Sequence, residues 1–194
     1  MTEKKRDANR TKKKLLDAVG TILATQGFTE LKVNTICDEA GVDKKLIYFH
    51  FGDLNGLISE FLRSHDFWMT EEAEVTNVDK DVAFQVFRKQ FESLDNSDLL
   101  KRLLVWELSE PNEILRKLAD AREELGDELI ARYKAQQQPG QDVHPIFALL
   151  VSGIYYLTIH SAINGSAFCG LDLQMQADKD RLFNGIKRVI DNCV

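Results

Sequence analysis

A short stretch of the chain, residues 44–51, mixes basic and aromatic side chains. It reads KKLIYFHF, so two lysines, three aromatic residues and a histidine fall within about two helical turns. A buried helix would exclude the lysines, and a solvated helix would not carry so many apolar side chains. A DNA groove accepts both, because lysines contact phosphates or guanine edges and apolar groups contact thymine methyls. The stretch is therefore a candidate DNA-reading helix.

Two short helices joined by a tight turn would position this stretch. Apolar residues at helical spacing predict a helix over 33–40, which Gly41 ends. The turn AGVD then leads into a helix over 44–50, on which Ile47 and Phe51 face inward. This spacing is typical of a helix-turn-helix motif.

Helical spacing of apolar residues continues along nearly the whole chain, and no long segment alternates with the period of a strand. A first helix carries the stripe from Leu15 to Leu23, and Asp53 is a suitable N-cap for a fourth, through about residue 70. We therefore expect an all-α fold, with a three-helix helix-turn-helix domain over 1–52 and a second helical domain over 53–194. Further helices are expected over 80–95, 98–109, 111–133 and 145–164, and from Leu182 to the C-terminus.

Charge is distributed unevenly along the chain, whose net charge is −6. Residues 1–65 carry 11 Lys and Arg against 9 Asp and Glu, whereas residues 66–194 carry 14 against 22. Seven of these bases fall within the first 14 residues, where we expect mobile lysines that add nonspecific attraction to a polyanion. A solubilising tail is the alternative interpretation.

Several classes of protein are disfavoured by what the sequence lacks. Cys37, Cys169 and Cys193 do not have metal-ligand spacing, so we expect reduced structural thiols, no metal site and no cofactor. We find no nucleophile motif, phosphate loop or paired-carboxylate pattern, which argues against an enzyme. The apolar run from Ile146 is too short to predict a membrane span, and no signal peptide opens the sequence. A cytoplasmic protein is expected.

The N-terminal stretch resembles the TetR family of bacterial transcriptional regulators from about residue 11 to residue 62. The matching residues are QGF, which ends the first helix, and TICDEAGVDKKLIYFHFGDLNGLI from Thr35 to Ile58. The resemblance implies contacts to bases or phosphates from the third helix and a backbone-phosphate contact from the start of the second. The residues concerned are Lys32, Asn34, Thr35, Lys44, Lys45, Tyr48, Phe49 and His50.

The third helix can be divided by role. We expect Lys45, Leu46 and Phe49, near its exposed start and centre, to read bases, and Tyr48 and His50 to contact phosphates. The sequence departs from the family pattern here, since Lys45 stands where a small residue is common and Leu46 where Ser or Thr is common. Departures also occur at Lys32, where Thr or Ser is usual, and at Leu54, where Lys is usual. Another member's operator therefore cannot be transferred to this chain.

Residues 66–194 resemble the family in architecture alone, which implies a ligand pocket and a homodimer formed by the last two helices, about 143–168 and 178–193. Small residues in the first of these helices permit close approach, and the C-terminal apolar stripe needs a partner. The expected dimer residues are Gly153, Leu182, Phe183, Ile186, Val189 and Ile190. The pocket candidates, for which ordinary core is the alternative, are Phe87, Phe91, Trp106, Tyr155, Tyr156, His160 and Asn164.

The sequence thus favours a dimeric transcriptional regulator, most often a repressor, that binds a palindromic double-stranded DNA operator. A small-molecule effector of unknown identity would release it, through a pocket adjoining the fourth helix near Phe67 and Trp68. One alternative is an effector-independent DNA-binding protein, and another is a helical ligand carrier or enzyme. Salt-dependent DNA binding would distinguish either DNA-binding protein from a carrier or enzyme. Loss of DNA binding on adding a metabolite would distinguish the effector-controlled regulator from the effector-independent protein.

Overall fold

The fold of the chain is all-α, as the apolar periodicity predicts. A computed structural model describes residues 2–64, 77–136 and 142–193, in which regular structure is helical apart from one isolated bridge between Phe168 and Leu171. The chain divides into two compact units. The N-terminal unit comprises residues 1–67 with 102–114, and the C-terminal unit comprises residues 68–101 with 115–194.

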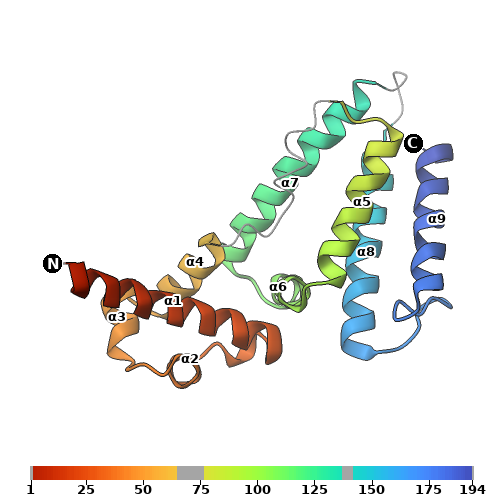
Figure 1. Cartoon of the computed structure of the whole chain (residues 1–194). Helices are drawn as coiled ribbons and strands as arrows, with labels where there is room; N and C mark the ends of the chain where they lie inside the picture. Colours follow the sequence, from red (N-terminus) through yellow and green to blue (C-terminus); the bar gives the residue numbers. More distant parts are fainter. Residues whose placement is uncertain (1, 65–76, 137–141, 194) are drawn as a thin grey trace. The chain divides into compact units, whose positions relative to one another are not determined.

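The N-terminal unit is built around helix α1 (Thr2–Thr25), which lies across α2 (Val33–Ala40) and α4 (Leu54–Ser64) (Figure 1). A single helical turn, η1 (Phe28–Glu30), and the short helix α3 (Lys45–Phe51) complete it, together with part of α6. Burial of one apolar face from each helix holds the unit together. The fully buried residues are Leu15, Val19, Ile22, Leu23, Ile36, Ile47 and Leu57.

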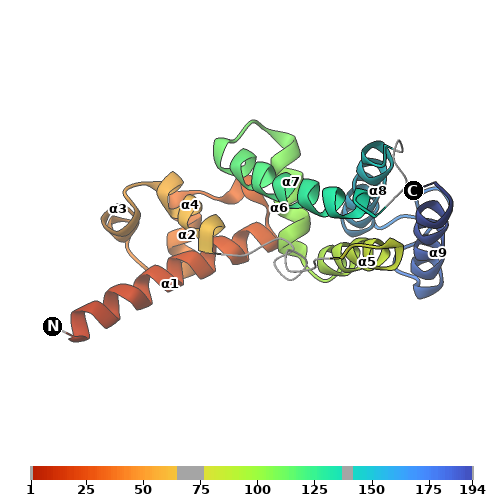
Figure 2. The ribbon, with the colours of Figure 1, turned by 90° about the horizontal axis from the view of Figure 1, so that it is seen from above.

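Helix α1 is longer than the apolar stripe alone predicts. The basic residues before Leu15, which we expected to be mobile, continue the helix back to Thr2. Residues 2–14 contain neither Gly nor Pro and are rich in Lys and Arg, which are good helix formers. The N-terminal bases are therefore carried on a helical extension, seen at the N-terminus in Figure 2.

The C-terminal unit is formed mainly by long helices. These are α5 (Lys80–Asp95), α7 (Glu113–Lys134), α8 (His144–Asn164) and α9 (Gln176–Cys193), and α6 (Asp98–Ser109) begins in this unit. Helix α5 packs against both α8 and α9 (Figures 1 and 2). Expected and observed helices agree closely for α5 and α6, and within a few residues for α7 and α8.

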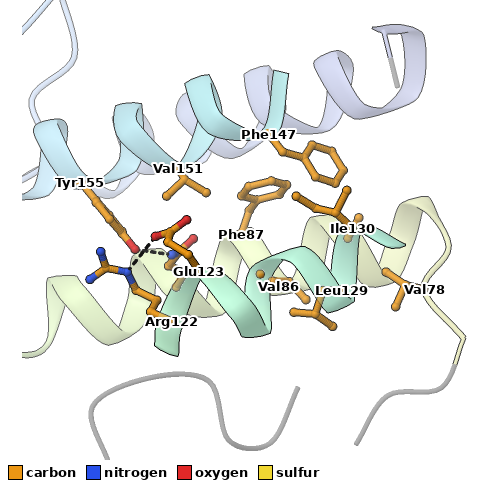
Figure 3. Close-up of a pocket in the computed structure, with 13 residues that line it drawn as sticks. Val78, Val86, Phe87, Arg122, Glu123, Leu129, Ile130, Phe147, Val151 and Tyr155 are labelled. Carbon is orange, nitrogen blue, oxygen red and sulfur yellow. Dashed lines mark hydrogen bonds and ion pairs between the residues drawn. The ribbon is translucent and has the colours of Figure 1, made fainter. Parts of the chain in front are cut away.

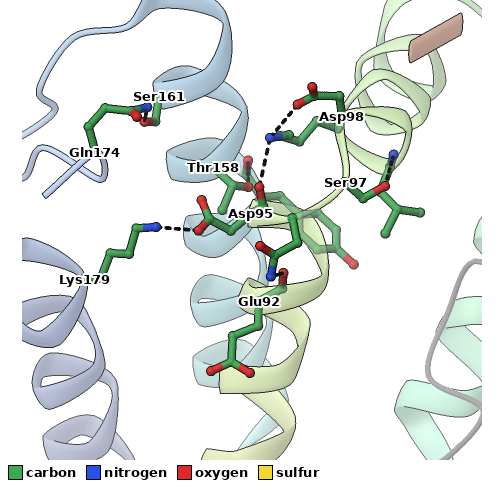
Figure 4. Close-up of polar contacts among 12 residues, drawn as sticks. Glu92, Asp95, Ser97, Asp98, Thr158, Ser161, Gln174 and Lys179 are labelled. Carbon is green, nitrogen blue, oxygen red and sulfur yellow. Dashed lines mark hydrogen bonds and ion pairs between the residues drawn. The ribbon is translucent and has the colours of Figure 1, made fainter. Parts of the chain in front are cut away.

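Polar contacts fix the position of α9 along α5. Lys179 forms an ion pair with Asp95 at the end of α5 (Figure 4), and Lys187 Nζ lies 3.0 Å from Asp81 Oδ1 near its start. Because these pairs lie two turns apart on α9, they fix the register of its packing on α5.

Part of the apolar stripe of α9 is buried within the chain, whereas we expected the stripe to be covered by a second subunit. Ile186 is 4% exposed and Ile190 is fully buried, while the Phe183 ring lies 5.1 Å from that of Phe91 on α5, centroid to centroid. Periodicity located this face correctly, but α5 of the same chain covers it. Ile186 and Ile190 are therefore buried without a partner subunit, whereas Leu182, Phe183 and Val189 remain half-buried.

Helix α8 leaves a different apolar stripe exposed. Four exposed residues lie on one face of this helix, because they are spaced three, four and seven positions apart: Leu149, Ser152, Tyr156 and Ile163. We call these residues the α8 outer face. We expected the apolar run from Ile146 to be too short for a membrane span. Helix α8 is nevertheless long and apolar enough to cross a membrane, the one such helix among the described residues. That is weak evidence for a membrane span, since core helices of soluble proteins share these properties.

Candidate functional site

The turn between α2 and α3 is set by Gly41 and Asp43. Gly41 adopts a left-handed conformation (φ 62°, ψ 44°), which glycine adopts without steric cost. The following Val42 N–H donates to the Cys37 carbonyl at 3.1 Å, closing α2 with a Schellman-type bond. The Asp43 carboxylate then accepts a hydrogen bond from the Lys45 N–H at 2.8 Å. Backbone and side chain together fix where α3 begins.

The inner face of α3 is held against α4. Ile47 is completely buried, and the Asp53 carboxylate caps α4 by accepting from the Gly56 N–H at 2.7 Å, which confirms the predicted cap. A Cβ placed on Gly56 would lie 2.0 Å from the Phe51 carbonyl oxygen, so this close approach requires glycine. The position of α3 is therefore determined by backbone contact as well as by apolar burial.

The opposite side of α3 presents a mixed surface. Phe49 is 78% exposed and Tyr48 is 53% exposed, and Lys44 and Lys45 are also exposed. Leu46 and His50 are half-buried beside them. We call these six residues the α3 outer face. It brings together all the DNA-binding candidates expected on this helix.

His50 lies at the less exposed end of the α3 outer face. Its ring makes an edge contact with Phe49 at 4.9 Å between centroids. Burial, and secondarily the positive charge of Lys12, lowers the pKa of His50. At neutral pH the uncharged imidazole is therefore favoured, and this form carries one N–H that can donate a hydrogen bond.

The DNA-binding candidates at the start of α2 differ in exposure and in whether they are already paired. Asn34 is exposed and Thr35 is half-buried, whereas the Lys32 ammonium pairs with Glu30 at 3.1 Å. Such an exposed pair exchanges easily with solvent or with another anion. Lys32 would have to leave Glu30 in order to contact a phosphate.

A second candidate site is a cavity of about 90 Å³ in the C-terminal unit, lined by α5, α7 and α8 (Figure 3). Its walls are mainly apolar, with the Phe87 and Phe147 rings 5.2 Å apart between centroids. Polar groups gather at one end of it: Gln90 Nε2 donates to the Tyr155 hydroxyl at 2.9 Å, and Arg122 Nε to Glu123 at 3.3 Å. An apolar cavity with a few polar groups is the usual composition of a small-molecule site.

The predicted pocket residues do not all meet at this cavity. Phe87 and Tyr155 line it, whereas Phe91 is buried towards α9. Trp106 lies in the N-terminal unit, where its ring stacks on Phe28 at 5.6 Å and its indole N–H donates to Glu110 at 2.8 Å.

Three further candidates form a separate cluster near the end of α8. His160 contacts Tyr156 and Phe168, with ring centroids 5.5 and 5.4 Å away, and forms hydrogen bonds with Asn164 and Ser166. The Tyr156, His160 and Asn164 side chains therefore engage one another and the following loop, away from the cavity.

Sequence reasoning missed the polar end of the cavity, formed by Gln90, Arg122 and Glu123. A signal for Arg122 exists, since it lies seven residues from both Leu115 and Leu129, and all three are buried on one stripe of α7. A charged residue at an apolar position of a stripe points to a functional or paired group. The expected adjacency of the pocket to Phe67 and Trp68 lies outside the described residues.

Within the ranges described, no group of three or more His, Cys, Asp or Glu is placed to hold a metal ion. Cys37 is buried in the N-terminal unit, and burial raises the pKa of its thiol, helped by the charge of Asp38. Cys37 is thus an unreactive core thiol at neutral pH.

Comparison with known proteins identifies the N-terminal domain. Residues 11–61 match the family described as bacterial regulatory proteins, tetR family. No curated protein sequence matches the chain significantly.

Two solved structures share the fold along nearly the whole chain. A putative TetR-family transcriptional regulator from Rhodococcus sp. is 21% identical, with a TM-score of 0.66, covering 93% of this chain and 98% of that one. NalD, the secondary repressor of the MexAB-OprM multidrug efflux pump in Pseudomonas aeruginosa, is 18% identical, with a TM-score of 0.59, covering 94% and 96%. At such identities the likeness shows the fold of the chain, and the family match shows that its N-terminal domain, residues 11–61, is that of the tetR family of bacterial regulatory proteins.

Proposed function

We propose that this regulator is a repressor that reads its operator with the α3 outer face. The main observation that supports this proposal is that Phe49 and Tyr48 are exposed beside Lys44 and Lys45. The other side of the same helix packs against α4. Aromatic rings that remain largely exposed are unfavourable in water, and adjacent lysines oppose contact with another basic surface. A DNA major groove satisfies both groups.

The roles proposed within the interface follow exposure. Lys45 and Phe49, which are exposed, and Leu46 beside them would contact base edges and thymine methyls. Tyr48 and His50 would donate to phosphate oxygens. Lys44 and the start of α2, namely Lys32, Asn34 and Thr35, would add backbone contacts that set the register on the duplex.

A homodimer is proposed as the functional form. Two copies of the helix-turn-helix related by a two-fold axis would read a palindromic operator. The α8 outer face supports this proposal, because Leu149, Tyr156 and Ile163 are exposed on a helix that carries no Lys, Arg, Asp or Glu. Gly153 lies beside this face and would permit close helix approach. The α9 residues Leu182 and Val189, half-buried within the chain, are proposed at its edge.

The cavity of the C-terminal unit is proposed as the effector site. Its apolar walls and its polar end suit a small molecule, which would release the protein from DNA by binding one arrangement of the dimer more tightly than the other. The proposed location of this regulator is the cytoplasm, where DNA and metabolites are both accessible. No catalytic role is proposed for it.

The DNA-binding proposal is tested by titrating the purified chain into labelled duplex at several salt concentrations. Selection from a randomised duplex pool should enrich a palindromic sequence. Affinity for random duplex should fall linearly on a logarithmic plot against salt, because each phosphate contact releases counterions. Affinity that does not change with salt, or no enrichment of any sequence, contradicts the proposal.

The effector proposal is tested on the enriched operator. A metabolite extract should release the protein from the operator, and a substitution in the cavity wall, Val151→Trp, should reduce the response while leaving DNA affinity unchanged. If no small-molecule fraction changes DNA affinity, the alternative of an effector-independent DNA-binding protein is favoured instead.

A further inference from the structure

A buried amide lies at the polar end of the C-terminal cavity. Gln90 on α5 is 7% exposed, and it lines the cavity together with the residues labelled in Figure 3. Its Nε2 donates a hydrogen bond to the Tyr155 hydroxyl at 2.9 Å, which holds the amide in place. Glutamine is seldom buried to this extent unless both of its polar atoms have hydrogen-bond partners.

The carbonyl oxygen of Gln90 has no partner within the described residues. The bond to Tyr155 is the one polar contact of the Gln90 side chain there, and it uses an N–H. In the same part of the chain, the one side-chain polar atom that is both sealed from solvent and unpaired is the Tyr133 hydroxyl. Gln90 Oε1 is therefore not sealed, and it remains accessible from the cavity that Gln90 lines.

The two charged residues at this end of the cavity are already engaged. Arg122 Nε donates to Glu123 Oε1 at 3.3 Å, and Arg122 has a further interaction within the chain. The other residues that line the cavity are uncharged. A charged ligand would therefore lose hydration without gaining a free counter-charge, which is unfavourable. The cavity thus favours a neutral ligand.

A ligand that covers the apolar walls also excludes water from Gln90 Oε1. A buried acceptor that loses water without gaining a donor costs more free energy than a typical hydrogen bond returns. A ligand that carries a donor at this point supplies the missing partner, whereas a hydrocarbon or an ether leaves the oxygen unpaired. Sites of this kind discriminate against analogues that lack the donor.

We propose that the effector is a neutral, largely apolar molecule whose hydroxyl group donates a hydrogen bond to Gln90 Oε1. This inference rests on the proposed function of the cavity as the effector site. The apolar part of the ligand would lie against Phe87, Phe147 and Val151. A hydroxyl is assigned in preference to an alkylamine, because the amine is positively charged at neutral pH.

The experiment uses three probes on the full-length protein without DNA: phenol, anisole and toluene. Phenol donates and accepts hydrogen bonds, anisole only accepts, and toluene does neither. Dissociation constants are measured by NMR titration for the wild type and for Gln90→Leu, and their ratios are compared because the probes differ in hydration. Gln90→Leu should shift the ratio between toluene and phenol by about three- to tenfold against phenol, the usual size of one hydrogen bond.

Three results would overturn the proposal. The first is that phenol does not bind, and the second is that Gln90→Leu leaves the ratio between toluene and phenol unchanged. The third is an equal shift for anisole, which would mean that the amide N–H contacts the ligand in place of the carbonyl oxygen. Benzoate should bind more weakly than phenol, and equal binding would contradict a neutral ligand.

A matched variant and a second measurement assign the effect to Gln90. Gln85→Leu, at an exposed position of the same helix, should keep the wild-type ratios, and the same shift in this variant would contradict the assignment. If Gln90→Leu does not fold, the wild-type protein decides. Phenol should then move the NMR signals of the Gln90 side-chain amide much more than toluene does, and equal movement contradicts the hydrogen bond.

Release from DNA is measured separately with phenol on the enriched operator. Phenol binding through Gln90 without DNA release would keep the ligand class and remove the proposed effector control. Release of DNA by compounds without a donor, together with no donor preference in binding, would keep effector control and overturn the ligand class.

Discussion

Helices α3 and α8, one in each unit, both leave large apolar side chains exposed, but the charges around these side chains differ. On α3, Phe49 is 78% exposed among lysines, whereas on α8, Leu149 is 72% exposed on a helix with no Lys, Arg, Asp or Glu. Apolar groups beside basic groups suit a polyanion with apolar base edges. An uncharged apolar stripe suits another protein surface. The charge context, more than the apolar exposure, separates the two proposed partners.

A second contrast lies within the C-terminal unit, between α8 and α9. Both helices have apolar stripes, but α5 covers the stripe of α9 and leaves the outer face of α8 exposed. A carboxylate introduced into each stripe should therefore have a different consequence. This pair of substitutions is expected to give the largest effects.

Ile186→Glu should destabilise the fold itself by about 3–5 kcal/mol, since it buries an unpaired charge against α5. Leu149→Glu should leave the free energy of unfolding of each subunit nearly unchanged and convert the dimer to monomer, because a two-fold axis introduces the charge twice. Chemical denaturation and sedimentation velocity measure the two quantities. A tight dimer for Leu149→Glu would remove the α8 outer face from the interface and break the contrast.

The contact between α3 and α4 can be tested through Gly56. Gly56→Ala should lower the free energy of unfolding by about 1–3 kcal/mol, because the new methyl group meets the Phe51 carbonyl oxygen and displaces one helix from the other. Gly185→Ala on α9 is the matched control, since nothing lies within 4 Å of its added Cβ. We expect the control to stabilise by about 0.5–1 kcal/mol. Denaturant titration of both variants decides, and a neutral Gly56→Ala would contradict the close approach.

The smallest expected effect concerns the charge of His50. Its pKa in the folded chain is lowered from 6.5 by burial and by Lys12, so between these two pKa values the unfolded chain binds more protons than the folded one. The free energy of unfolding should therefore fall as pH drops through 6.5, and His50→Gln should weaken this dependence. Urea denaturation over a pH series tests the difference. Identical pH dependence for both proteins would mean that burial and Lys12 do not lower the pKa of His50 in the folded chain.

Local patterns in the sequence predicted most of the helices and the helix-turn-helix. The apolar spacing around Ile36 and Ile47 and the stop at Gly41 are local signals that the structure reproduces. Asp53 likewise acts as a cap, as its residue type and position indicate.

Features that depend on long-range pairing were not predictable in the same way. Periodicity identified the apolar face of α9, but not that α5 covers it. Trp106 was assigned to the pocket because it is aromatic, yet it stacks on Phe28, 78 positions earlier in the chain. Arg122 was overlooked because charged residues are usually exposed, although its seven-residue spacing from Leu115 and Leu129 places it on the buried stripe of α7.

The claim that α3 reads DNA is tested most directly with Lys45→Ala, titrated on the selected operator and on random duplex over a range of salt. We predict a loss of about 1–3 kcal/mol on the operator and much less on random DNA, the usual size of a direct base contact. Lys13→Ala, an exposed lysine of α1, should instead weaken both complexes alike. Equal losses on both duplexes for Lys45→Ala, or no loss on either, would contradict base reading by the α3 outer face.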